Sequence, residues 1–195
     1  MDTSTNEGVK PYPPNEYIQT SHTLNRVSRK AVLHGTSNIV LGGKCIIHSG
    51  AMVRGDLKRA ASGSTIAIST GRYCVVGEGT VLRPPYKTYK GTFSYYPVKL
   101  GDFVHIGSSS VLQATSVGSH IDIGRDCIIG RFVTVKDCVR ICDGSVVAPY
   151  TTIPSGQVWA GNPAKKVGSL PETWAELHEA RGRDYYGRFR PATLS

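Results

Sequence analysis

A six-residue period runs through much of this 195-residue sequence and limits what the chain can fold into. From Val117 onward, every sixth residue is large and apolar, as far as Trp159. The series is Val117, Ile123, Ile129, Val135, Ile141, Val147, Ile153 and Trp159. Large apolar residues make up about a quarter of the chain, so eight in step has a chance on the order of one in fifty thousand per starting frame.

A second series lies two residues before the first and consists mostly of small or β-branched residues. Its members are Thr115, Ile121, Cys127, Val133, Val139, Ser145, Thr151 and Gln157. The same pattern continues upstream with slips. Leu100, Ile106 and Leu112 follow the period and are then offset by one, and earlier runs are Thr70, Val76 and Leu82, and Leu41, Ile47 and Val53.

A period of six suits strands and not helices. An α-helix advances about 100° per residue, so every sixth position points in a new direction. A strand alternates with period two, so positions two apart share a face, and six is a multiple of two. Short strands separated by bends then stack as a parallel β-solenoid.

The pattern resembles the left-handed parallel β-helix built from hexapeptides, with three units to a coil. The resemblance supplies the handedness, because the usual crossover rule favours the opposite hand. We therefore predict an all-β solenoid with a C-terminal α-helix.

The rest of the chain divides around this solenoid. Residues 1–16 are polar and Pro-rich and are predicted to be a disordered tail. The β-helix is predicted over 17–168, with loops thrown out at 57–67 and 83–97. Residues 169–195 are predicted to form a C-terminal helix and tail, with the helix over 171–186. We expect this helix to cover an open end of the solenoid.

Composition excludes several classes. No run of about 18 apolar residues occurs, so no spanning helix and no direct membrane insertion are expected. The first residues lack a secretory apolar segment, and five cysteines fit reduced thiols in the cytoplasm. The net charge of +9 lies mostly in residues 1–97, where 12 Lys and Arg face 5 Asp and Glu. No nucleic-acid motif accompanies this charge, so no nucleic-acid partner is expected, and the basic half is a candidate contact for an acidic protein.

The segment 83–97 combines aromatic, basic and proline residues. Its candidate anchors for a protein contact are Arg83, Tyr86, Tyr89, Phe93, Tyr95 and Tyr96. Tyrosine and arginine are enriched in protein interfaces. The alternative, weighed equally, is that the rings only cover a neighbouring coil.

Catalytic and metal motifs give little signal. The sequence lacks GxxxxGK[ST], GxGxxG, GxSxG, CxxC and HExxH, so no cofactor is expected. Cys138 and Cys142 are a weak metal signal, whereas Cys45, Cys74 and Cys127 fall in the inward series and are predicted core residues. His105 and His120 are the candidates for an acyltransferase general base, but a structural role is favoured for both.

Arg54-Gly55-Asp56 resembles a turn of the γ-class carbonic anhydrases, in which three histidines bind zinc. That resemblance places the ligand-equivalent positions at Arg83, Ser108 and Gln113, and none of them is histidine. Arginine does not deprotonate to bind a metal, and serine and glutamine are poor zinc ligands. We therefore expect no metal and no catalytic residue at these positions.

A closer resemblance is to the dynactin subunit 5 family. It rests on EYIQTSHTLNRVSR, SNIVLGGKCIIHSGAMVRGDL, GRYCVVGEGTVLRPPYK, YYPVKLGDFVHIGSSSVL, GRDCIIGRFVTVKDCVRICD and the ending LPETWAEL…YYGRF. The resemblance implies a non-enzymatic subunit at the pointed end of dynactin, in the cytoplasm and associated with the cytoskeleton. It also implies as partners the subunit 6 paralogue, subunit 4, the pointed-end actin-related protein and dynein cargo adaptors. The alternative is a γ-carbonic-anhydrase-like or hexapeptide acyltransferase enzyme, because VWAGNPAKKV resembles the closing coil of such enzymes.

Overall fold

The computed structural model describes residues 9–58 and 66–192, which fold into a three-sided prism of stacked parallel strands. Sheet I contains β1 (Tyr17–Gln19), β2 (Arg26–Ser28), β5 (Ile46–Ile47), β8 (Val75–Val76), β13 (Val104–Ile106), β16 (Ile121–Ile123), β19 (Val139–Ile141), β22 (Gln157–Gly161) and β23 (Ala164–Ser169). Sheet II contains β3 (Val32–His34), β6 (Met52–Arg54), β9 (Val81–Leu82), β14 (Val111–Leu112), β17 (Ile128–Ile129) and β20 (Val146–Val147). Sheet III contains β4 (Ile39–Gly43), β7 (Ile68–Arg72), β12 (Val98–Leu100), β15 (Ser116–Val117), β18 (Thr134–Val135) and β21 (Thr152–Ile153).

The structure is the predicted left-handed parallel β-helix, and its strand register follows the hexapeptide period. Ile123 pairs with Ile141, eighteen residues later, which is three hexapeptides per coil. Ile106 pairs with Ile123 after seventeen residues, and this one-residue deficit is the slip seen in the sequence. Val76 follows its partner Ile47 by twenty-nine residues, so this coil holds eleven extra residues. Eleven is the length of the segment 57–67, of which 59–65 lie outside the described residues, whereas Ala67 is buried.

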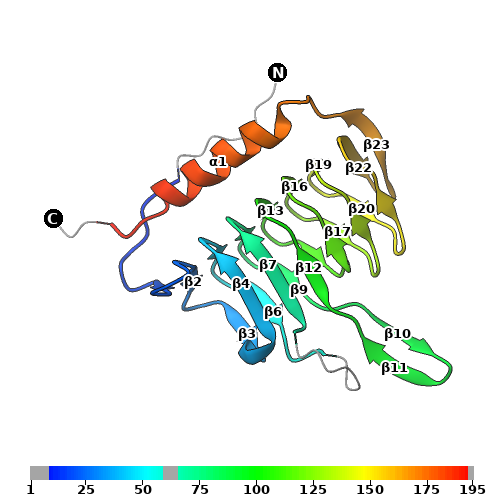
Figure 1. The fold of residues 1–195 in the computed structure, drawn as a ribbon, viewed down its shortest axis with the longest axis horizontal. Helices are drawn as coiled ribbons and strands as arrows, with labels where there is room; N and C mark the ends of the chain where they lie inside the picture. The colour runs from blue at the N-terminus through cyan, green and yellow to red at the C-terminus, as the bar shows by residue number, and fades with distance from the viewer. Residues whose placement is uncertain (1–8, 59–65, 193–195) are drawn as a thin grey trace.

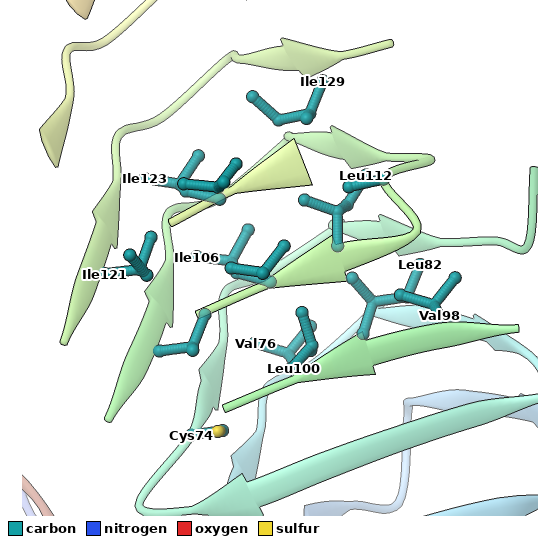
Figure 2. Packing of buried hydrophobic residues seen from close by; sticks show 14 of the residues in the cluster. Cys74, Val76, Leu82, Val98, Leu100, Ile106, Leu112, Ile121, Ile123 and Ile129 are labelled. Atoms are coloured by element: carbon teal, nitrogen blue, oxygen red, sulfur yellow. The ribbon is translucent and has the colours of Figure 1, made fainter. Parts of the chain in front are cut away.

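The prism is filled by the inward residues of all three sheets. Figure 2 shows Val76, Ile106 and Ile123 stacked above one another, beside a second column of Leu82, Leu112 and Ile129. Cys45, Cys74 and Cys127 are buried free thiols of the same core, as predicted. Each coil contributes the same few side chains to the next, so burial of aliphatic surface holds the stack together.

The N-terminal segment differs from its prediction as a disordered tail. Residues 1–8 lie outside the described residues, but Tyr12 is only 5% exposed. Its ring centroid lies 4.6 Å from that of Tyr17 and 4.8 Å from that of Phe189. The Tyr12 backbone N–H also donates to the Arg190 carbonyl over 3.0 Å. The segment is polar overall, so its composition did not predict that Tyr12 would be buried. The contacts of Tyr12 hold residues 9–16 against the C-terminal segment.

Helix α1 (Trp174–Arg188) lies along the prism and not across its end. The predicted start at Pro171 is three residues early, and the predicted role as an end cover is wrong. Trp174 Nε1 donates to the His120 carbonyl over 2.9 Å, and Tyr186 Oη donates to the Leu24 carbonyl over 2.7 Å, so the helix crosses successive coils. Figure 1 shows it alongside the stack, on the opposite side from β10 and β11. The antiparallel strands β1 and β23 cover the two edges of sheet I instead.

Two glycines of α1 provide a matched test of its packing. A Cβ added to Gly182 would lie 2.9 Å from the Phe103 ring, whereas one added to Gly187 meets nothing within 4 Å. Phe103 cannot move easily, because its ring stacks on those of Tyr73 and His120. We expect Gly182→Ala to lower the free energy of unfolding by about 1–3 kcal/mol through overpacking. Gly187→Ala should raise it by up to about 1 kcal/mol through helix propensity. Urea unfolding of both variants checks this, and equal effects would contradict the described packing.

Candidate protein-docking site

The segment 83–97 forms an ordered hairpin and not an irregular loop. Strands β10 (Tyr86–Tyr89) and β11 (Thr92–Tyr95) pair antiparallel, with Tyr86 opposite Tyr95. The turn residues Lys90 and Gly91 have φ angles of 46° and 77°. Two positive φ angles in a two-residue turn match the twist of a tight hairpin. The hairpin projects from the prism, as Figure 1 shows.

The candidate aromatic anchors divide between two environments. The ring centroids of Tyr86 and Phe93 lie 5.4 Å apart, and those of Phe93 and Tyr95 lie 5.0 Å apart, so these three form one cluster. Tyr96 packs edge-on against Phe132 of the prism, with 5.3 Å between centroids. Tyr89 and Phe93 remain 63% and 52% exposed. Tyr96 therefore covers a coil, while the hairpin keeps two rings in solvent. That these residues contact another protein stays a prediction.

Within the described residues, the cations around these rings have no carboxylate partner. The Arg131 guanidinium lies 4.7 Å from the centroid of Tyr86, and Lys87 Nζ lies 4.9 Å from that of Tyr96. The Arg83 guanidinium is 6.0 Å from the Tyr86 centroid, and its buried Nε has no hydrogen-bond partner within the described residues. In the described part of the chain, no Asp or Glu oxygen lies within 4 Å of the charged nitrogens of Arg83, Lys87 or Arg131. Aromatic faces stabilise these charges but do not neutralise them.

The three zinc-ligand-equivalent positions do not form a metal site. The Arg83 N–H donates to the Leu112 carbonyl, so Arg83 lies beside Gln113 at one end of the sheet II strands. Ser108 lies before β14, next to Gly77, at the other end of the strand. A guanidinium, an amide and a hydroxyl do not fit a zinc ion, which prefers imidazole, thiolate or carboxylate. Across 9–58 and 66–192, no group of three His, Cys, Asp or Glu side chains is placed to hold a metal.

Sequence reasoning missed a histidine cluster under α1. His48 is buried between two tyrosines, with 3.0 Å from Nδ1 to Tyr17 Oη and 2.8 Å from Nε2 to Tyr185 Oη. Burial, with a contribution from the nearby His105, lowers the pKa of His48 to about 4. Burial likewise raises the pKa of Tyr17 and Tyr185 to about 12. No local motif marks this cluster, because its members come from distant parts of the chain.

A row of charged side chains crosses sheet I beside this cluster. His105 Nδ1 donates to Asp122 Oδ1 over 3.0 Å, and Arg140 Nε lies 3.8 Å from Asp122 Oδ2. Although burial opposes it, the hydrogen bond from His105 lowers the pKa of the Asp122 carboxyl below its usual value. His120, the other candidate base, is paired with Glu179 of α1 and stacked on Phe103.

A polar hollow of about 420 Å³ opens beside His105. Glu78, Ser108, Arg125 and Tyr185 are among its lining residues. A histidine held by a carboxylate has the geometry of a general base. Here the same carboxylate also lies near Arg140, so the row links three successive coils and has an evident structural role.

Comparison with known proteins identifies the family. The family model described as "Dynactin subunit 5" matches residues 6–195. The chain belongs to the dynactin subunit 5 family. Dynactin subunit 5 of Dictyostelium discoideum is 39% identical over 110 residues, which cover 56% of this chain and 51% of that protein. The hairpin and the histidine cluster are therefore features of a dynactin subunit 5 family member.

Enzymes share this fold. Gamma carbonic anhydrase 2 of Arabidopsis thaliana mitochondria is 28% identical over 135 residues, which cover 69% of this chain and 45% of that protein. This chain thus spans about half the length of these curated relatives. A hexapeptide transferase family protein from Anaplasma phagocytophilum superposes with a TM-score of 0.60 at 20% identity, covering 84% of this chain and 89% of the other. An N-acyltransferase from Bacillus cereus superposes with a TM-score of 0.62 at 16% identity, covering 82% of this chain and 87% of the other.

Within the described residues, no helix has the length and apolar content needed to cross a membrane.

Proposed function

We propose that this chain is a non-enzymatic structural and adaptor subunit of the dynactin pointed-end complex. There it supports engagement of dynein-driven cargo such as endosomes. Its partners are the subunit 6 paralogue, subunit 4, the pointed-end actin-related protein and dynein cargo adaptors. It acts in the cytoplasm, associated with the cytoskeleton. The family match over residues 6–195 carries this proposal.

The geometry supports a docking role. Stacked coils make a stiff scaffold, and loops on rigid scaffolds are common contact sites. The hairpin presents Tyr89 and Phe93 to solvent, next to cations that lack carboxylate partners among the described residues. An aromatic anchor with adjacent positive charge suits an acidic protein surface.

An enzymatic role finds less support. The zinc-ligand positions of the carbonic anhydrases hold Arg83, Ser108 and Gln113. The His105 and Asp122 pair is shared with Arg140. We expect no thermal shift on adding acetyl-CoA to the purified chain and no stoichiometric zinc by elemental analysis. A saturable shift or one zinc per chain would favour the enzyme instead.

Affinity purification of the tagged full chain from cells that make dynactin tests the proposal. We expect the wild-type chain to recover dynactin subunits. The double variant Tyr89→Ala and Phe93→Ala should reduce that recovery at least about tenfold, since a lost hot spot of 1.4 kcal/mol is a factor of ten. Leu177→Ala, which removes a 60%-exposed apolar side chain from α1, is the matched control and should leave recovery unchanged. A wild-type chain that recovers no dynactin subunit contradicts the proposal.

A further inference from the structure

The outer face of sheet II carries a continuous row of aliphatic side chains. Each strand of this sheet has an outward apolar residue in register with that of the next strand, and β3 and β6 also carry the polar outward residues His34 and Arg54. The row is Val32, Met52, Val81, Val111, Ile128 and Val146. Val32 is 40% exposed and Ile128 is 48% exposed, while the others are half-buried. We call this row the aliphatic stripe.

The other two outer faces are different. On sheet III the equivalent register positions hold Val40, Ser69, Lys99, Ser116, Thr134 and Thr152, so all but one are polar. On sheet I, Ile46 and Val75 are apolar, but the aromatic residues of the N-terminal segment and α1 cover them. An exposed strand face normally alternates to polar residues. Sheet II departs from that rule at one position on every strand, and this position stays partly accessible to solvent.

The size and shape of the stripe indicate what fits it. Rungs about 4.8 Å apart give a row about 24 Å long. The strands of this face are two or three residues long and stack in register, so the face is narrow and flat. Apolar residues that gather on an exposed face mark candidate interaction sites. A helix lying along the row would cover the row alone, whereas another flat sheet face can also reach the charged residues along its edges.

Charge along one edge of the stripe indicates the chemistry of the partner. Arg54 is the last residue of β6 and is paired with Asp56 over 2.8 Å. Arg83 follows β9 and Arg131 lies two residues beyond β17, and both lack a carboxylate partner within the described part of the chain. The opposite edge carries the acidic Glu78 and Asp126. A second copy carries the same net charge of +9, and long-range repulsion between two such chains disfavours self-association.

We propose that the aliphatic stripe is a docking face for a different protein, which presents a flat aliphatic sheet face edged by carboxylates opposite Arg83 and Arg131. This inference deepens the proposed function by naming a contact surface. It rests on the proposed function for one point, the expectation that the partner is a dynactin subunit. The stripe lies on the prism itself, so it adds a second contact surface to the hairpin.

Site-directed photo-crosslinking tests the face in cells that make dynactin. The tagged full chain carries benzoylphenylalanine in place of Ile128, or in place of Thr134 on sheet III as the matched control. We expect position 128 to crosslink at least ten times more strongly than position 134. The crosslinked peptide should come from a sheet of a dynactin subunit that has Asp or Glu beside aliphatic residues. A peptide with that chemistry from a protein outside dynactin would keep the docking face and contradict the proposed function.

Other outcomes overturn the docking face. Crosslinks from position 128 to another copy of this chain, to a basic or purely polar peptide, or to nothing would each do so. Charge reversal tests the edge separately: Arg83→Glu together with Arg131→Glu should reduce the position-128 crosslink at least fivefold. Thermal unfolding confirms that each variant is folded, and an unchanged crosslink in a folded charge-reversal variant overturns the assignment of an acidic partner.

Discussion

Ile129→Ala should lower the free energy of unfolding by about 2–5 kcal/mol, the cost of a cavity in a well-packed core. The Ile129 side chain is 0% exposed and pairs in register with Leu112 on one side and Val147 on the other. Each coil shares its core with both neighbours, so the cavity would open at two coil interfaces.

Ile128→Ala is the matched control in the same strand. It removes the same atoms from a side chain that is 48% exposed and belongs to the aliphatic stripe. We expect a change within about 0.5 kcal/mol, as is usual at the surface. Guanidinium unfolding of both variants measures the difference. If the two variants lost equal stability, the alternation of inward and outward residues described here would be incorrect.

That alternation explains why the fold could be predicted from the sequence. The repeat is local, so the pairing of residues eighteen apart, such as Ile123 with Ile141, recurs along the prism. The same signal extended to the aliphatic stripe, which sequence reasoning missed. Val81, Val111, Ile128 and Val146 each directly precede a large inward residue, where a solvent-facing strand position would ordinarily be polar.

The parts outside the repeat depend on contacts between distant residues. Arg26 of β2 donates to the carbonyls of Tyr186 and Phe189, more than 150 residues away in sequence, and its guanidinium lies 3.8 Å from the centroid of the Tyr186 ring. No local pattern encodes such a pairing, so the position of α1 along sheet I and the order of residues 9–16 could not be predicted. The hairpin was found by composition, because aromatic and basic residues gather in one segment. Composition could not show which of its rings stay in solvent.

Acidification should weaken the fold as the pH falls from about 6.5 to about 4. Burial lowers the pKa of His48 from 6.5 to about 4, so the folded state holds the neutral ring while the unfolded chain binds a proton. The stabilisation is therefore complete above pH 6.5 and is lost progressively down to about pH 4. A shift of this size corresponds to about 3 kcal/mol, of which about 2 kcal/mol is lost at pH 5. Burial also lowers the pKa of His178, which adds loss in the same direction.

His48→Gln isolates this contribution, because the amide can hydrogen-bond with the tyrosine hydroxyls but does not titrate. The difference in unfolding free energy between pH 7.5 and pH 5 should shrink by about 2 kcal/mol in this variant. His178 remains, so some pH dependence persists. His22→Gln, at an exposed histidine, should keep the wild-type acid limb. Urea unfolding at both pH values measures the difference, and an acid limb equally steep in His48→Gln and wild type would show that protonation of His48 is not coupled to unfolding. His48 joins Tyr17 of β1 to Tyr185 of α1. If its protonation is coupled to unfolding, the packing of α1 and β1 on sheet I is the pH-sensitive part of the fold.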